Sequence, residues 1–373
     1  MVRILHTADL HLGQEFVQLE PDDRRKLARA RLTVVDEILN VAEQFSVDVV
    51  LCAGDIFDVP NVSQDWWEGL AKALAARRDW IRPVILLPGN HDPVRSGAVF
   101  EKGHPFRAQL PPWVHVVDRD DFELVIGDQA VVYASPCRST AGAENLSLTL
   151  PARTAGDLRI RIGMVHGSTF DLPDHPTNFP IATDATTQRG LDYLAVGDTH
   201  SYREVPENAV APIIYPGAPE PTSFSDVDAG YVVVATFRKS GVRPQIFRQR
   251  VSTWHWRDET VTSVGQLRTL ASEDLIQTLL RVCLDMEVSA AEEKEVDNLI
   301  AQLKGTLATT GRAGALVLDR RKLRSLPPTV EELGGLPDTL AHVARSLSQE
   351  APTSDEARRA LRILAQYVSE AAQ

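Results

Sequence analysis

The sequence is short of the features that mark secreted, disulfide-bonded and membrane proteins. Its 373 residues include only three cysteines, far apart and without a Cys-x-x-Cys pair, which indicates neither a disulfide framework nor a thiolate metal site. The apolar runs at 47–53 and 84–88 are far below the roughly 18 residues that a membrane-spanning helix needs. Residues 1–10 lack the basic region and apolar stretch of a signal peptide. We therefore expect a cytoplasmic protein with no membrane partner.

Positive charge is also scarce. The chain carries 39 Lys and Arg residues against 51 Asp and Glu residues, a formal net charge of −12, and the acidic excess is spread along the sequence. A nucleic-acid-binding protein usually carries a basic face, which this composition does not indicate. Bound divalent cations would offset several carboxylates, so the charge does not exclude a nucleic-acid substrate.

Hydrophobic residues, in contrast, make up 43% of the chain and recur with clear periods. Over 1–250, short strand-like runs alternate with amphipathic stretches such as 22–45 and 63–78. This alternation predicts a layered α/β sandwich (α+β in part) of two packed mixed β-sheets flanked by helices. The closely spaced runs between 113 and 251 favour a second sheet with antiparallel character.

The composition changes near residue 252, where we expect the first domain to end. The runs that follow predict a small α+β module, and two helical patterns come after paired prolines and glycines. The predicted domains are residues 1–252, residues 253–326, and a helical C-terminal tail at 327–373.

Short polar motifs follow predicted strands at five places. They are Asp9-Leu10-His11, Gly54-Asp55-Ile56-Phe57-Asp58, Gly89-Asn90-His91-Asp92, His166 in Met-Val-His-Gly, and Gly197-Asp198-Thr199-His200. Each motif alone is weak, because turn residues and buried histidines give similar matches. Together they favour one site, since ligands converge at the carboxyl ends of strands in layered α/β folds. The mixture of carboxylate, imidazole and amide groups suits Mn²⁺, Fe²⁺ or Zn²⁺.

In order and spacing, these motifs resemble the calcineurin-like metallophosphoesterases. The runs Thr-Ala-Asp-Leu-His-Leu-Gly at 7–13, Ala-Gly-Asp-Ile-Phe-Asp at 53–58 and Tyr-Pro-Gly-Ala-Pro-Glu at 215–220 are similar to the SbcD branch of DNA repair nucleases. The resemblance covers about residues 1–250, which it implies are the catalytic domain. The 253–326 module resembles the capping domain of that branch only in position and pattern.

The resemblance implies two divalent metal ions, Mn²⁺ foremost, with Mg²⁺, Fe²⁺ or Zn²⁺ as alternatives. One ion would be held by Asp9, His11, Asp55 and His200, and the other by Asp55, Asn90, His166 and Asp198. His91 would act on the scissile phosphate as a catalytic residue. The carboxylate of Asp58 would orient His91 and favour its protonated form. Asp92 would shape its own loop.

One position departs from the family pattern, which has Gly-His-x-His where this chain has Asp198 in place of the first histidine. Either Asp198 ligates through oxygen or the second metal is held more loosely. A carboxylate here makes Mn²⁺ a better fit than Zn²⁺. Its charge would also penalise a dianionic phosphomonoester more than a monoanionic phosphodiester.

Outside the motifs, candidates for substrate contacts are weaker. His104, Arg107 and Arg138 could reach a substrate backbone, and a structural or surface role is the alternative for each. A short basic cluster is the best nucleic-acid contact outside the site, although we favour a solvated loop for it. It consists of Arg320, Arg321, Lys322 and Arg324.

The leading hypothesis is a Mn²⁺-dependent DNA nuclease that hydrolyses phosphodiester bonds by direct attack of activated water, in DNA repair or end processing. The alternative is a phosphodiesterase or phosphatase acting on a small molecule or a phosphoprotein. The protein-phosphatase branch is disfavoured, because Val59-Pro60 follows Asp58 where those enzymes have Arg-Gly.

A third hypothesis is a scaffold that docks a partner. The resemblance implies DNA and a coiled-coil ATPase of the SbcC type as partners. An apolar stripe in the tail could dock that ATPase, and packing within the chain explains the stripe equally well. It consists of Leu340, Val343, Ala344 and Leu347. The sequence leaves exonuclease or endonuclease action, and the oligomeric state, open.

Overall fold

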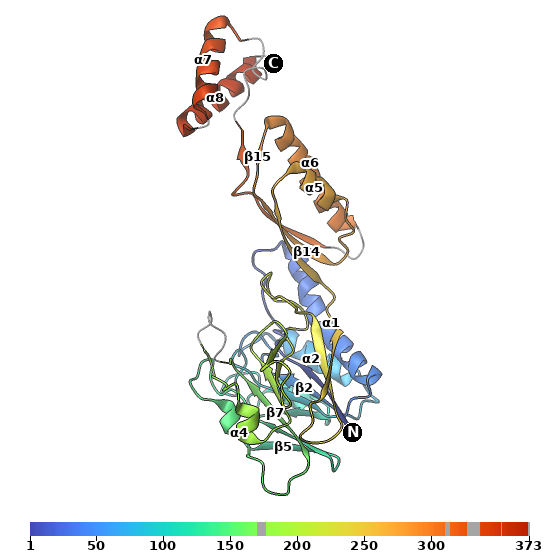
Figure 1. The fold of residues 1–373 in the computed structure, drawn as a ribbon. Coiled ribbons are helices and arrows are strands. Elements are labelled where there is room, and N and C mark those ends of the chain that lie inside the picture. Colours follow the sequence, from blue (N-terminus) through green and yellow to red (C-terminus); the bar gives the residue numbers. More distant parts are fainter. Residues whose placement is uncertain (170–176, 310–313, 327–335, 352, 372–373) are drawn as a thin grey trace. The chain divides into compact units, whose positions relative to one another are not determined.

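The computed structural model describes residues 1–169, 177–309, 314–326, 336–351 and 353–371. The chain divides into two compact units, Met1–His255 and Trp256–Gln373 (Figure 1). The finer division into three domains stays a prediction. Within the described residues, no helix is both long and apolar enough to span a membrane.

The larger unit contains a six-stranded sheet in the order β12-β11-β1-β2-β3-β4. Strands β1 to β4 run parallel to one another, while β11 pairs antiparallel with both β1 and the edge strand β12. The bounds are Val2–Thr7 for β1, Val49–Ala53 for β2, Val84–Leu87 for β3, Val114–Val116 for β4, Tyr231–Phe237 for β11 and Gln245–Arg250 for β12.

A second six-stranded sheet has the order β5-β6-β7-β8-β10-β9. Its bounds are Phe122–Ile126 for β5, Ala130–Ala134 for β6, Ile160–His166 for β7, Tyr193–Gly197 for β8, Arg203–Val205 for β9 and Ile213–Tyr215 for β10. The pairs β6-β7, β7-β8 and β8-β10 are parallel, and only the two edge pairs are antiparallel.

The expected antiparallel character is therefore confined to the two edge pairs, and the expectation that all the strands between 113 and 251 belong to this sheet was wrong. Its centre is parallel, and β4, β11 and β12 belong to the first sheet. Parallel neighbours need long crossover connections, and the residues between β6 and β7 and between β7 and β8 supply them. A period-2 pattern shows that a strand exists, but it does not show which neighbour that strand will pair with.

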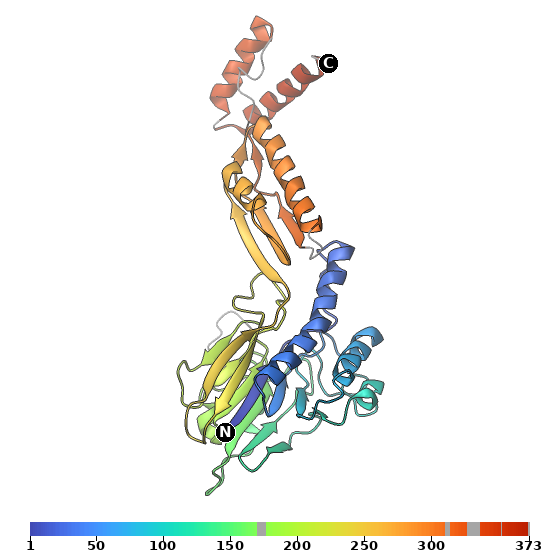
Figure 2. The ribbon, with the colours of Figure 1, turned by 90° about the vertical axis from the view of Figure 1, so that its right-hand side faces the viewer.

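The core is layered because side chains alternate across each strand. Ile4 and Leu51 point into the cluster between the two sheets, where they meet Ile162 of the second sheet. Leu5 and Val50 point to the other side, against helices α1 (Pro21–Gln44) and α2 (Gln64–Ala75), which cover the first sheet (Figure 2). The short helices α3 (Pro105–Gln109) and α4 (Ala185–Arg189) and a 3₁₀ turn (Leu146–Leu148) complete the unit. The predicted sandwich of two mixed sheets flanked by helices is confirmed.

The second unit contains a sheet in the order β13-β14-β16, a two-stranded ladder of β15 and β17, and four helices within the described residues. The strand bounds are His255–Val261 for β13, Thr278–Leu284 for β14, Glu287–Val288 for β15, Ala315–Asp319 for β16 and Arg324–Ser325 for β17. Helices α5 (Val264–Ala271) and α6 (Ala290–Thr309) share a core with the sheet. Strand β13 and helix α5 were not predicted.

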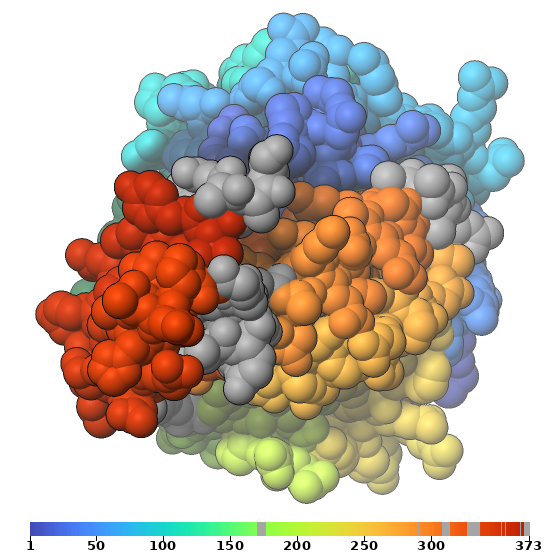
Figure 3. Space-filling view, turned by 90° about the horizontal axis from the view of Figure 1, so that it is seen from above, coloured from blue at the N-terminus to red at the C-terminus, as the bar shows by residue number. Residues whose placement is uncertain are grey.

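The unit ends in helices α7 (Asp338–Glu350) and α8 (Asp355–Ala371), drawn in red in Figure 3. The packing of α7 against α8 buries only part of the apolar stripe predicted at residues 340–347. Ala344 and Leu347 pack in the cluster between the helices, while Leu340 and Val343 remain 41% and 47% exposed. Packing within the chain thus accounts for half of the stripe.

Candidate metal centre

The polar motifs meet where strands of both sheets end. Asp9 and His11 follow β1, and their backbone N–H groups donate to the carbonyls of Gly54 and Asp55, 3.0 Å away in each case. This ladder holds Asp9, His11 and Asp55 in left-handed backbone conformations, with φ of 55°, 45° and 50°. Such conformations are costly outside glycine and persist only where surrounding contacts impose them. The loops after β1 and β2 are therefore built to hold these side chains in place.

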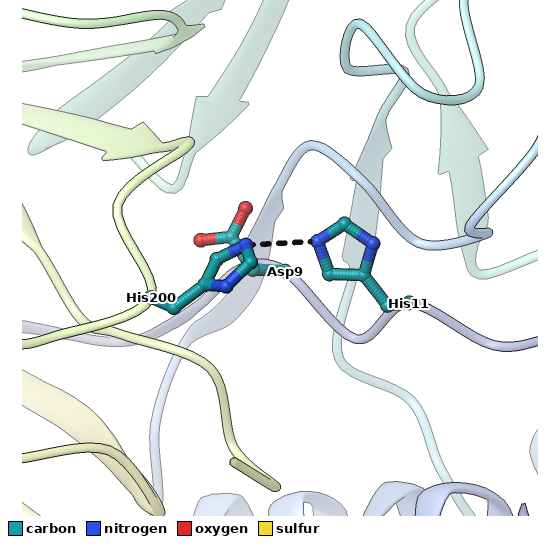
Figure 4. Close-up of side chains that lie close together, drawn as sticks. All are labelled: Asp9, His11 and His200. Atoms are coloured by element: carbon teal, nitrogen blue, oxygen red, sulfur yellow. Dashed lines mark hydrogen bonds between the residues drawn. The ribbon is translucent and has the colours of Figure 1, made fainter. Parts of the chain in front are cut away.

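The first cluster consists of Asp9, His11 and His200, whose ligand atoms all lie within 4.8 Å of one another. Figure 4 shows the three side chains converging, with Nε2 of His11 and Nε2 of His200 only 3.1 Å apart. Asp9 is fully buried. Its Oδ1 accepts from the backbone N–H of Asp198, and its buried Oδ2 has no hydrogen-bond partner in the described part of the chain.

The second cluster consists of Asp9, Asp55 and His166. Nε2 of His166 lies 2.8 Å from Oδ1 of Asn90 and 3.3 Å from Oδ2 of Asp55. The same Asp55 oxygen lies 3.8 Å from Nε2 of His11. Asp55 thus sits between the histidines of the two clusters, as a bridging ligand would.

Asp198 lies at the margin of the second cluster. Its Oδ1 is 3.9 Å from Nε2 of His166, and its Oδ2 accepts a hydrogen bond from the hydroxyl of Ser168. Among the described residues it joins neither of the two tight clusters. The 3.9 Å distance is comparable with the 3.8 Å between Asp55 and His11, so both arrangements that the sequence left open stay predictions.

The tautomers of three histidines follow from their neighbours. Nδ1 of His11 faces the Asp58 carboxylate at 2.9 Å, Nδ1 of His166 faces the Ala53 carbonyl at 2.9 Å, and Nδ1 of His91 faces the Asp58 carbonyl at 2.8 Å. Carbonyl and carboxylate oxygens only accept, so each Nδ1 must carry the proton. Each Nε2 of a neutral ring then keeps a lone pair, which is the form that binds a metal.

These lone pairs face other acceptors at short range, as the His11–His200 and His166–Asn90 contacts show. Two acceptors without a shared proton repel each other, and either a bound cation or a proton on Nε2 removes that repulsion. Burial opposes protonation of His166, but Asp55 and the other nearby carboxylates raise its pKa well above the ordinary value, so the metal-free ring can hold that proton. The donor set of carboxylate, imidazole and amide oxygen is one that Mn²⁺, Fe²⁺ and Zn²⁺ accept. The residues present therefore fit a pair of divalent cations.

The pKa values of His200, Asp55 and Asp9 also fit a centre that binds cations. Burial, and next to it the neighbouring His11, lowers the pKa of His200 to about 4, so its imidazole is neutral at physiological pH. Burial opposes ionisation of Asp55, but His166, His11 and His91 together hold its pKa below the ordinary range. Burial raises the pKa of Asp9 well above its ordinary value, which is the penalty that a neighbouring cation would relieve.

Asp92 ties two of the motif loops together. Its Oδ1 accepts from the backbone N–H of Gly89 at 2.7 Å, and its Oδ2 accepts from that of Phe57 at 2.8 Å. Burial and the charge of Asp55 raise the pKa of Asp92 to about 7, against these two hydrogen bonds. The prediction that Asp92 shapes its loop is confirmed.

The role expected for the Asp58 carboxylate, which is to orient His91, stays a prediction, since one ligand atom from each of His11, Asp58 and His91 lies within 4.8 Å of the others. The carboxylate contacts His11, and Nδ1 of His91 donates to the backbone carbonyl of the same residue. The loop after β2 turns the Asp58 side chain toward the β1 loop, where His11 lies. Spacing along the sequence does not show that turn.

The weaker sequence candidates have partners elsewhere. His104 accepts from the backbone N–H of Phe106 at the start of α3, and its ring meets that of Trp67 edge-on. Arg107 and Arg138 pair at 2.9 Å with Asp118 and Asp120, one carboxylate each. These contacts support the structural alternative for all three residues.

The basic cluster is neutralised in the same manner. Each of its four side chains lies within 4.0 Å of a carboxylate, the pairs being Arg320–Asp297, Arg321–Asp319, Lys322–Asp285 and Arg324–Glu287. These pairs leave the cluster little net charge to offer a nucleic acid.

A cavity of about 580 Å³ opens beside the metal centre. His91, Asp198 and His200 line it, and hydroxyl-bearing residues make up most of the rest. No lysine or arginine is among the described residues that line it. The sequence analysis did not predict that Thr222, Ser223, Ser225 and Asp226 line this cavity. The Tyr-Pro-Gly-Ala-Pro-Glu run at 215–220, which resembles the SbcD branch, lies just before them and could have pointed to this segment.

Comparison with known families agrees with this geometry. The sequence profile of the calcineurin-like phosphoesterases matches residues 2–202, more than half of the chain. The chain belongs to this family. The predicted family is thus confirmed.

The relatives include both uncharacterised and DNA-processing proteins. The uncharacterised metallophosphoesterase YhaO of Bacillus subtilis is 28% identical over 240 residues, which are 62% of this chain and 56% of YhaO. The SbcD component of the nuclease SbcCD from Rhodobacter capsulatus is 44% identical over 96 residues, 25% of this chain and 22% of SbcD. The DNA double-strand break repair protein Mre11 of Saccharolobus solfataricus is 23% identical over 221 residues, 59% of this chain and 55% of Mre11. The chain spans about half the length of these curated relatives, or less.

The close approach of β2 and β7 gives the first testable prediction. A Cβ added at Gly54, where φ is +99°, would lie 2.0 Å from Nδ1 of His166, whereas one added at Gly97, where φ is +77°, meets nothing within 4 Å. Both alanine variants carry the left-handed backbone penalty of about 1–2 kcal/mol. Gly54→Ala should lose a further ~1–3 kcal/mol of unfolding free energy through overpacking.

Denaturant unfolding and Mn²⁺ titration of the two variants test this account. We expect Gly97→Ala to keep the wild-type Mn²⁺ affinity and Gly54→Ala to lose it, because His166 must move. Equal stability and equal Mn²⁺ affinity in the two variants would contradict the packing described here.

Proposed function

We propose that this chain is a Mn²⁺-dependent DNA nuclease that hydrolyses phosphodiester bonds. The convergence of His, Asp and Asn side chains on two adjoining clusters, with Asp55 between them, carries the proposal. Two divalent cations bound there would polarise the phosphate and activate the attacking water. The names of the SbcD and Mre11 relatives, a nuclease and a DNA repair protein, support DNA as the substrate.

His91 is the proposed proton donor to the leaving oxygen. Its backbone N–H donates to Oδ1 of Asp55 at 2.9 Å, and its Nδ1–H donates to the Asp58 carbonyl at 2.8 Å. The backbone and the Nδ1 side of the ring of His91 are thus both held by hydrogen bonds, and Nε2 is available to the substrate. A protonated His91 ring would donate from Nε2, which is the task of a general acid.

The cavity supports a diester over a monoester. Asp198 and Asp226 place carboxylates on its wall, and no lysine or arginine of the described lining offsets them. A dianionic monoester would meet more repulsion there than a monoanionic diester. The same lack of basic side chains, with the paired basic cluster, favours the alternative substrate, which is a small-molecule phosphodiester.

The remaining assignments are part of this proposal. Residues 1–252 would be the catalytic domain and 253–326 a capping domain. The 327–373 tail would dock a coiled-coil ATPase of the SbcC type, and Leu340 and Val343 on α7 are exposed for such a contact. The proposed location is the cytoplasm.

A nuclease assay tests the proposal. Metal-stripped protein with added Mn²⁺ is incubated with circular single-stranded DNA, linear duplex DNA, bis-p-nitrophenyl phosphate and p-nitrophenyl phosphate. We expect loss of DNA, and a rate lower by about 10²-fold or more in His91→Ala, since a positioned acid contributes that much. The matched control His342→Ala changes a histidine of α7, outside the catalytic unit, and should keep the wild-type rate.

The outcomes separate the candidate functions. Cutting of the circle shows endonuclease action. Intact DNA with rapid cleavage of the small diester would favour the small-molecule alternative. Intact DNA with rapid monoester hydrolysis would overturn the substrate class altogether.

Substitution of Asp198 tests the origin of diester preference. Asp198→His removes one negative charge beside the substrate phosphate and restores the family residue. We expect the diester-to-monoester ratio of kcat/KM to fall at least about tenfold, equivalent to ~1.4 kcal/mol. Asp128→His makes the same change in an exposed turn and should leave the ratio unaltered. An unchanged ratio in Asp198→His would show that Asp198 does not set the preference.

A further inference from the structure

His200 differs from the other histidines of the centre in the partner of its Nδ1. That atom lies 2.6 Å from the hydroxyl oxygen of Thr222, rather than beside a carbonyl or carboxylate. A hydroxyl can donate or accept, so this contact alone leaves both neutral tautomers of His200 open. The partner of the hydroxyl must decide between them.

Asp226 is that partner. Its Oδ2 lies 2.7 Å from the Thr222 hydroxyl and also accepts the backbone N–H groups of Thr222 and Ser223. A carboxylate only accepts, and the hydroxyl has one proton to give. The proton therefore goes to Asp226, and the hydroxyl accepts from His200. Nδ1 of His200 must carry the hydrogen, and Nε2 keeps the lone pair.

The other tautomer of His200, with its hydrogen on Nε2, could form a hydrogen bond to His11. Nε2 of His200 lies 3.1 Å from Nε2 of His11, which is itself a lone-pair atom because Asp58 holds the Nδ1–H of His11. A hydrogen on Nε2 of His200 could bond to His11 and would occupy both metal-binding atoms at once. The contacts to Thr222 and Asp226 disfavour this tautomer, because they require the hydrogen of His200 to be on Nδ1.

The loop that carries Thr222 is fixed relative to His11. The buried guanidinium of Arg31 donates to the carbonyl of Leu10 at 3.0 Å and to that of Pro221 at 2.9 Å. Leu10 lies between Asp9 and His11, and Pro221 directly precedes Thr222. One side chain of α1 thus joins the two loops that hold the first cluster.

We propose that Thr222 and Asp226 are a positioning pair that fixes His200 in its metal-binding tautomer and thereby sets the cation affinity of the first cluster. The inference rests on the proposed metal centre and adds two residues to it. Neither residue need touch the cation or the substrate. Groups that orient a metal-bound histidine typically change metal affinity by about 10- to 100-fold.

Calorimetric titration of metal-stripped protein with Mn²⁺ tests the pair without any substrate. Thr222→Val keeps the shape of the side chain and removes the hydroxyl, and we expect a Kd higher by about 10- to 100-fold. Thr222→Ser keeps the hydroxyl and should stay within about threefold of the wild type. Thr33→Val makes the same change on the exposed face of α1, where the hydroxyl donates to the Arg29 carbonyl, and should bind as the wild type does.

Nitrogen NMR of the wild type gives a test that needs no folded Thr222 variant. In metal-free protein, the His200 signal, assigned by its loss in His200→Gln, should report hydrogen on Nδ1 and a bare Nε2. Hydrogen on Nε2 in the wild type, or equal Mn²⁺ affinity in Thr222→Val and the wild type, would overturn the proposal. A wild type that binds no Mn²⁺ would instead overturn the metal centre itself.

Discussion

Crowding of acceptor atoms in a buried space is the constraint on which the site depends. Oxygens of Asp9 and Asp55 and lone pairs of His11, His166 and His200 face one another within a few ångströms. Such a cluster is unfavourable unless positive charge compensates it. Three features hold these side chains in place despite their mutual repulsion. They are the left-handed loops after β1 and β2, the hydrogen bonds of Asp92 to two motif loops, and those of Arg31 to the carbonyls of Leu10 and Pro221. The fold therefore maintains a centre that bound cations would stabilise, in place of the protons that the raised pKa values of His166 and Asp9 favour without them.

Much of this centre was predictable because its signals are local. Each proposed ligand ends its strand or follows it by at most four residues, so the loops after β1, β2 and β3 deliver Asp9, Asp55 and Asn90 to a sheet edge. Parallel pairing of β1, β2 and β3 then brings the three edges together.

Features that depend on tertiary packing were not predictable in this way. The partner of the Asp58 carboxylate, the neighbours of β4 and β11, and the contact of Thr222 with His200 all join residues far apart in the sequence. Thr222 carried no motif, because a hydroxyl becomes informative only when both of its partners are known. Arg31 likewise looked like an ordinary charged residue of an amphipathic helix, yet it is fully buried.

The central claim is a two-cation centre, and anomalous X-ray diffraction from crystals grown with Mn²⁺ tests it most directly. The account predicts two anomalous peaks, one among Asp9, His11 and His200 and the other among Asp55, Asn90 and His166. Both peaks should contact Asp55. Well-ordered side chains with no peak, or a single peak away from Asp55, would contradict the account.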